Sequence, residues 1–250
     1  MPGLPEAAFG HEGIEYHGRI NCLKGGLVAA DRITTVSPSY AREITTAEFG
    51  AGLEGLLQAR AADLRGILNG IDAAFWDPTH DPALPHAYSP RRLGGKAICK
   101  AAALPISGRA IPAVWIACDE DRAHRIIAGG DLIAVPSRFE PCGLTQLYGL
   151  RYGTLPVVRA TGGLADTVSE ADGANGGQAR GNGFVFRDAH PAALSAALSR
   201  ALAAYRQPAN WKRLQRRAMA ERHDWDSVAI QYEAVYAEAL AEPRAPRWRQ

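Results

Sequence analysis

The chain has 250 residues, of which 47% are hydrophobic and 22% charged, and its formal net charge at pH 7 is +2. This composition is typical of a globular protein with one large or two small hydrophobic cores. It gives no reason to expect nucleic-acid binding, because the basic residues are dispersed, and Arg213, Arg216 and Arg217 suit a solvated helix face. No apolar stretch reaches transmembrane length, and residues 1–6 lack the features of a signal peptide, so we expect no membrane partner.

The cysteines and histidines show no pattern of a disulfide framework or a metal site. Four cysteines are widely spaced and form no CxxC pair, which fits a reducing cytoplasm. The seven histidines fall at spacings that suit neither one helix face nor a zinc knuckle. We therefore expect a cytoplasmic protein that holds no metal and no other cofactor.

In chain order, the first predicted strand is the β-branched run 33–36. A helix should begin directly after it, because Ser37 is a good N-cap and Pro38 suits the first turn. Residues 67–68 are interpreted as the end of a second strand, and Asn69 and the glycine after it as a turn.

Residues 50–55 spell GAGLEG, which matches the dinucleotide-binding fingerprint, and Asp72 follows at a suggestive distance. The fingerprint has physical meaning only when a buried strand comes directly before it. Residues 40–49 contain three charged side chains and no apolar run. We therefore interpret GAGLEG as a surface loop.

The segment 131–168 predicts two strand–loop–helix units in series. Residues 132–135 and 155–158 are short apolar runs of strand length, and each is followed by a glycine-containing loop. Leu144, Leu147 and Leu150 then recur at helical spacing. Two such units in series imply a parallel sheet with a right-handed crossover, and so an α/β fold of Rossmann type.

Ligands of such sheets bind beyond the carboxyl ends of the strands, where helix N-termini favour phosphate. The first of these loops contains Glu140, a carboxylate that is hard to explain as packing. It would either contact a ligand or act as an N-terminal acid of the next helix. Cys142 would either react with thiol reagents or serve as a small loop filler. The candidate residues of the two loops are Arg138, Glu140, Cys142, Gly143, Leu144, Thr145, Thr161, Gly162 and Gly163.

The rest of the sequence predicts helices, strands and loops that support the fold and contribute no candidate site residue. Residues 171–183 are rich in glycine and asparagine and suggest a flexible loop, followed by a strand at 183–186. Apolar stripes at helical spacing follow Pro191 and begin again at Trp225. The tail 242–250 is expected to be disordered.

The run SRFEPCGLTQLYGLRYGTLPVVRATGGLADTV, which begins at Ser137, resembles the sugar-nucleotide site of bacterial glycogen synthases and plant starch synthases. The resemblance extends over most of residues 13–240, including AADRITTVSPSYARE, GILNGIDAAFWDP and DEDRAHRIIAGGD. It implies a GT-B fold and transfer of glucose, with retention, from ADP-glucose to the non-reducing end of an α-1,4-glucan.

The same resemblance implies roles for individual residues. Glu140, the residue closest to a catalytic role, would contact the donor glucose, and Asn69 would line the donor cleft. Backbone groups at Cys142, Gly143, Gly162 and Gly163, with Thr145 and Thr161, would hold sugar and diphosphate. Arg138 and Leu144 belong to the same substrate-binding loop.

The chain also departs from the family pattern. The family has a lysine-containing, glycine-rich loop that helps hold the donor, and none is found here. An internal segment whose arginine and lysine contact the diphosphate is expected to be missing around residues 113–118, and Cys118 replaces a usual aromatic residue. We thus expect a truncated GT-B chain, with residues 1–68 from the acceptor-side domain, 69–224 a shortened nucleotide-sugar-binding domain, and 225–250 a returning helix and tail.

Three functions are compatible with these observations. The first is an active glucan synthase, and the second is a non-catalytic remnant that binds nucleotide or glucan. The third, a Rossmann-type oxidoreductase, is disfavoured because GAGLEG follows no strand.

Overall fold

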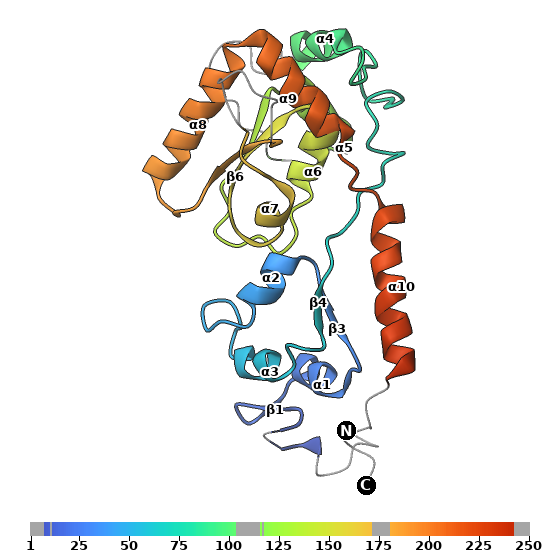
Figure 1. The fold of residues 1–250 in the computed structure, drawn as a ribbon, viewed down its shortest axis with the longest axis vertical. Helices are drawn as coiled ribbons and strands as arrows, with labels where there is room; N and C mark the ends of the chain where they lie inside the picture. The colour runs from blue at the N-terminus through green and yellow to red at the C-terminus, as the bar shows by residue number, and fades with distance from the viewer. Residues whose placement is uncertain (1–7, 11, 104–115, 117, 172–180, 243–250) are drawn as a thin grey trace. The chain divides into compact units, whose positions relative to one another are not determined.

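The computed structural model describes residues 8–10, 12–103, 116, 118–171 and 181–242. By its internal contacts the chain divides into two compact units (Figure 1). Unit 1 comprises residues 1–68 and 228–250, and unit 2 comprises residues 69–227.

Unit 1 is a small α/β assembly built around two parallel strands. Its elements in chain order are β1 (Glu15–Tyr16), β2 (Arg19–Ile20), α1 (Cys22–Ala29), β3 (Ile33–Thr35), α2 (Pro38–Glu43), α3 (Glu54–Ala59), β4 (Leu64–Gly66) and most of α10 (Trp225–Ala241). Strand β3 pairs in parallel with β4, and β1 pairs antiparallel with β2. The apolar side of α10 buries Val228 and Val235 against Ile67, which follows β4.

The sequence predictions for unit 1 are largely confirmed. The strand predicted at 33–36 is β3, and α2 begins where predicted, because the Ser37 hydroxyl accepts a hydrogen bond from the Tyr40 amide at 3.0 Å. GAGLEG forms a turn that leads into α3, with Gly52 in the left-handed region at φ +81°, and the element that comes before it is helix α2, not a strand. The strand end predicted at 67–68 is wrong: β4 ends at Gly66, and Ile67 packs on α10 instead.

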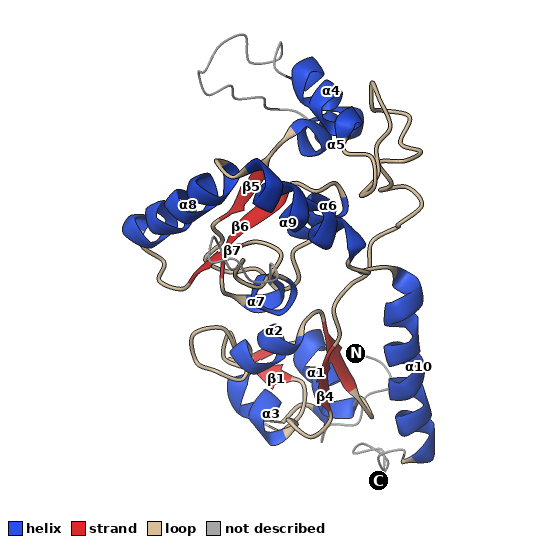
Figure 2. Cartoon of the chain, turned by 45° about the horizontal axis from the view of Figure 1, so that its top comes forward, coloured by secondary structure: helices blue, strands red, loops and turns tan. Residues whose placement is uncertain are grey.

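Unit 2 contains a parallel sheet covered by helices. Its elements are α4 (Gly94–Ala103), α5 (Glu120–Gly129), β5 (Leu132–Val135), α6 (Thr145–Arg151), β6 (Leu155–Arg159), α7 (Gly162–Thr167), β7 (Phe184–Phe186), α8 (Pro191–Tyr205) and α9 (Pro208–Ala220). The described strands form one sheet in the order β5-β6-β7. Helices α6, α8 and α9 pack against this sheet (Figure 2).

The core of unit 2 lies on the central strand. Residues 155–158 of β6 are buried. Leu155 and Val157 form one apolar cluster with Phe184 of β7 and Leu214 of α9, whereas Val158 belongs to a second cluster with Leu164 and Val168 of the α7 region. Continuous burial on both faces is what a parallel strand between two helix layers requires, which explains its unbroken apolar sequence. The predicted strands at 132–135, 155–158 and 183–186 and the helices after Pro191 and from Trp225 are confirmed.

Two predictions fall largely outside the described residues, namely the flexible loop at 171–183 and the tail at 242–250. Among the described residues, no helix is both long enough and apolar enough to span a membrane.

Candidate functional site

The predicted site residues gather where β5 and β6 end. These strands run parallel, so the segments beyond their carboxyl ends start side by side. We call these segments, residues 136–144 and 160–163, the glycine loops. All of the predicted site residues except Asn69 lie in the glycine loops or directly after them, namely Arg138, Glu140, Cys142, Gly143, Leu144, Thr145, Thr161, Gly162 and Gly163.

The two glycine loops touch through their backbones. The Gly163 amide donates hydrogen bonds to the carbonyl oxygens of Glu140 at 3.1 Å and Pro141 at 3.2 Å. A Cβ atom added to Gly162 would lie 1.9 Å from the Glu140 carbonyl oxygen, and one added to Gly163 would lie 1.8 Å from that of Cys142. No side chain fits at these distances, so the contact between the loops already requires both glycines. The structure gives these glycines a packing role, and the predicted approach of a ligand to them stays a prediction.

The buried side-chain amide of Gln146, which was not predicted from the sequence, connects the two glycine loops. Gln146 is fully buried, and its side-chain nitrogen donates to the Gly143 carbonyl at 2.6 Å and to the Thr167 hydroxyl at 3.1 Å. That hydroxyl donates in turn to the Gly163 carbonyl at 2.6 Å. The chain of bonds therefore joins one glycine loop to the other. The available signal was the helical spacing of Gln146 from Gly149 and Leu150, which places it on the buried side of α6, where a polar group needs partners.

Glu140 is half-buried and accepts a hydrogen bond from the Ser137 hydroxyl at 2.9 Å. The alternative that it is an N-terminal acid of the next helix is wrong. Helix α6 begins only at Thr145, it has no acidic residue in its first turn, and its N-cap Leu144 makes no side-chain capping bond. A role in ligand binding stays a prediction.

Asn69 reaches the same place from the turn after β4. Its backbone hydrogen-bonds the thiol of Cys142, which is 8% exposed. Burial raises the pKa of this thiol, and the hydrogen bond to Asn69 only partly opposes that rise. A buried thiol with a raised pKa is a poor nucleophile, which favours the loop-filler interpretation of Cys142.

The remaining predicted residues differ in exposure. Arg138 and Thr145 are exposed, Leu144 is half-buried against the core, and Thr161 is buried at the N-terminal end of α7. The Arg138 carbonyl accepts a hydrogen bond from Arg159 at 2.9 Å, which ties the first loop to the end of β6. The first turns of α6 and α7 both start at the loops, as expected for phosphate contact, and that contact stays a prediction.

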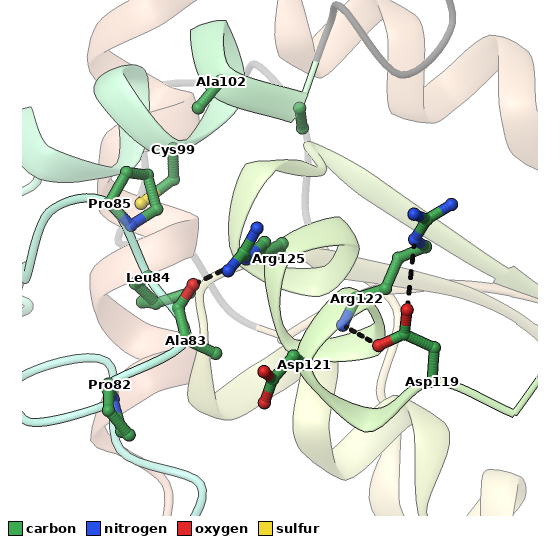
Figure 3. A pocket seen from close by; sticks show the side chains of 11 residues that line it. Pro82, Ala83, Leu84, Pro85, Cys99, Ala102, Asp119, Asp121, Arg122 and Arg125 are labelled. Carbon is green, nitrogen blue, oxygen red and sulfur yellow. Dashed lines mark hydrogen bonds and ion pairs between the residues drawn. The ribbon is translucent and has the colours of Figure 1, made fainter.

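A separate cavity of about 520 Å³ lies between α4, α5 and residues 82–85 (Figure 3). Arg125 donates to the Ala83 carbonyl at 2.8 Å on one side, and Arg122 faces Asp119 at 3.5 Å on the other. None of the predicted site residues lines it.

The known proteins that this chain resembles include glycogen synthases and starch synthases. The family model for the starch synthase catalytic domain matches residues 1–59. Glycogen synthase from Anaeromyxobacter sp. (strain Fw109-5) is 43% identical over 301 residues, covering 96% of this chain and 62% of the relative. Glycogen synthase from Leptothrix cholodnii is 44% identical, covering 96% of this chain and 61% of the relative.

Solved structures agree in fold. The catalytic domain of starch synthase IV from Arabidopsis thaliana, bound to ADP and acarbose, superposes with a TM-score of 0.87 at 29% identity. That match covers 96% of this chain and 63% of the other. Sucrose-phosphate synthase from Thermosynechococcus elongatus shares only the fold, with a TM-score of 0.53 at 19% identity and coverage of 91% and 64%. The predicted α/β fold of GT-B type is thereby confirmed.

The chain spans about three fifths of the length of the curated relatives it matches. The alignment with the Anaeromyxobacter protein runs over 301 positions although this chain has 250 residues, so more than fifty positions of the relative have no counterpart here. Sequence identity of 43–44% along nearly the whole chain, together with the fold, shows that the chain is homologous to glycogen synthases over the part of them that it matches.

Proposed function

We propose that this chain carries the donor-binding loops of an ADP-glucose-dependent glucan synthase. In this function, glucose passes from ADP-glucose to the non-reducing end of an α-1,4-glucan such as glycogen, with retention. The observation that carries the proposal is the pair of glycine loops, which belong to a chain 43% identical to a glycogen synthase. The four free cysteines fit the reducing cytoplasm as the place of action.

The loops have features that suit a nucleotide sugar. Glu140 is half-buried, and its carboxylate accepts a hydrogen bond from the Ser137 hydroxyl. Among the described partners of this carboxylate there is no cation, so it keeps its negative charge and its capacity to accept further hydrogen bonds. It would accept hydrogen bonds from donor glucose hydroxyls. The first turns of α6 and α7 would present backbone amides to the diphosphate, and the Gln146 bridge would fix the spacing between them.

A second candidate is a remnant that binds the donor without turning it over. The observation that favours it is the set of more than fifty positions of the glycogen synthase that have no counterpart here. By the family resemblance, the arginine and lysine that neutralise the departing diphosphate belong to the missing internal segment. We therefore propose that this polypeptide binds ADP-glucose but transfers little or no glucose.

Calorimetric titration with ADP tests donor binding on the full chain. We expect saturable heat that is lost in Glu140→Ala and in Gly162→Val, because valine at 162 would collide with the Glu140 carbonyl. Glu233→Ala, which removes an exposed carboxylate of α10 in unit 1, is the matched control and should bind as the parent does. Absence of heat at millimolar ADP in the parent would refute donor binding.

Transfer of labelled glucose from ADP-glucose to glycogen separates the two candidates. The Anaeromyxobacter glycogen synthase serves as the positive control. We expect this chain to be at least about 100-fold slower, the loss typical when one preorganised electrostatic group is removed. Turnover close to that of the control would establish the active enzyme and exclude the remnant.

A further inference from the structure

A second cavity in unit 2, of about 440 Å³, has the chemistry of a ligand site and contains none of the glycine-loop residues. It lies between α4, the end of α8 and the first half of α9. Figure 1 labels these three helices. Its size is within the range of small-molecule pockets.

Positive charge gathers around this cavity. Lys100, Arg206 and Lys212 line it from three different segments, and Asp131 is the one carboxylate among the described lining residues. Asp131 is already paired with Lys100, whose ammonium lies 2.6 Å away and also donates to the Tyr205 hydroxyl at 2.9 Å. Within the described part of the chain, the side chains of Arg206 and Lys212 have no hydrogen-bond or ion-pair partner. They are therefore available to an anion.

A fourth basic side chain, Lys96, forms part of the wall. Lys96 is 5% exposed, and its ammonium donates to the carbonyls of Ala128 at 2.9 Å and Tyr152 at 3.0 Å and to the Thr154 hydroxyl at 2.8 Å. These bonds fix the position of Lys96. Lys96 is therefore engaged with the protein, and the role of neutralising an anion is left to Arg206 and Lys212.

The cavity also offers a polar acceptor and an apolar wall. Gln215 is 6% exposed, and its amide nitrogen donates to the Gly153 carbonyl at 3.0 Å. No donor among the described residues reaches its amide oxygen, which can therefore accept a bond from a hydroxyl group. Tyr205 and Trp211 form an edge-to-face pair at 5.2 Å beside it, a surface that suits the C–H face of a sugar ring.

We propose that this cavity binds a small sugar phosphate. Arg206 and Lys212 would hold the phosphate, Gln215 would accept from a sugar hydroxyl, and the aromatic pair would cover the ring. A neutral glucan would leave the unpartnered cations without a counter-charge, and inorganic phosphate alone would leave the apolar wall unused. The site is separate from the glycine loops and does not depend on the function proposed for them.

The test is calorimetric titration of the full chain with glucose 1-phosphate, glucose and inorganic phosphate. We expect saturable binding of glucose 1-phosphate, weaker binding of inorganic phosphate, and none of glucose. The double variant Arg206→Gln with Lys212→Gln should weaken glucose 1-phosphate binding at least tenfold, since hydrogen bonds to charged groups are strong contributors. Gln215→Leu should weaken glucose 1-phosphate binding but leave inorganic phosphate binding unchanged.

Arg91→Gln is the matched control, because Arg91 is an exposed arginine of unit 2 outside the cavity. It should bind as the parent does, and circular dichroism confirms that every variant folds. The proposal is overturned if glucose 1-phosphate does not bind at millimolar concentration, or if the double variant binds it like the parent. It is also overturned if Gly162→Val abolishes this binding while the cavity variants keep it, since the ligand would then occupy the glycine loops.

Discussion

Replacing Gln146 by leucine removes the bridge between the glycine loops while keeping a side chain of similar size. The Gly143 carbonyl and the Thr167 hydroxyl each lose the donor that now reaches them at 2.6 and 3.1 Å. A buried polar group that loses its partner costs about 1–3 kcal/mol. The change also removes the Gln146 amide oxygen, which is buried without a partner among the described residues and offsets part of that cost.

We therefore expect Gln146→Leu to lower the free energy of unfolding by about 1–3 kcal/mol. In a chain of this size this corresponds to a fall in melting temperature of roughly 2–12 °C. The proposed donor site should suffer as well, because the first glycine loop is no longer fixed to the second. We expect ADP affinity to fall about tenfold, since misplaced binding groups lose the benefit of preorganisation.

Thermal unfolding by circular dichroism and calorimetric ADP titration measure the two effects. Gln231→Leu, on the exposed surface of α10, is the matched control for added apolar area and should change neither. If Gln146→Leu melts at the parent temperature and binds ADP with parent affinity, the bridge does not organise the loops and the reasoning is wrong.

Three further predictions concern the rest of the molecule. Burial lowers the pKa of Lys96 from its usual 10.5 to about 7, so between these pH values the unfolded chain binds more protons than the folded chain. The free energy of unfolding should therefore rise with pH over this range, by at most about 1.4 kcal/mol per pH unit. In a Lys96→Met variant, the melting temperature should lack this dependence on pH. Mass spectrometry of thiol labelling should find Cys22 and Cys118, both exposed, modified before Cys99 and Cys142, whose pKa values are raised by burial; simultaneous labelling in the folded chain would contradict the described burial. The short parallel pair β3-β4 and the exposed apolar residues Ile230, Tyr236 and Leu240 of α10 should cause self-association, and light scattering from a stable monomer would count against this.

The sequence predicted the elements whose pattern is local. Residues 155–158 are apolar without interruption because β6 is buried on both faces, and Ser37-Pro38 marks a helix start because capping depends on adjacent residues. Ile67 was misassigned because an apolar residue after a strand can either extend it or pack elsewhere. Its partners on α10 lie more than 150 residues away in the sequence.

The residues of the candidate site could be predicted from the sequence, but the contacts that hold the two glycine loops together could not. The motif identified the glycine loops, whereas the reason for Gly162 and Gly163 became evident only from the carbonyl oxygens of the facing loop. The Gln146–Thr167 bridge and the contacts of Lys100 with Asp131 and Tyr205 each join segments that no local pattern connects. Such groups follow from the fold, so they could not be predicted before it.

Donor binding and turnover should separate in this chain, because different parts of the family's machinery supply them. The glycine loops are held by their own contacts, namely the Gly163 amide on the opposite loop and the Gln146 bridge, and neither contact involves a cation. The proposed absence of the internal segment should therefore leave the loop geometry intact. The departing diphosphate, in contrast, develops charge that helix N-termini neutralise only in part. Loss of the family's arginine and lysine should thus reduce glucose transfer by at least about 100-fold while ADP binding persists. Measured on one preparation, ADP binding without comparable transfer fits this account, whereas transfer close to that of the Anaeromyxobacter glycogen synthase would show that other groups replace the missing cations.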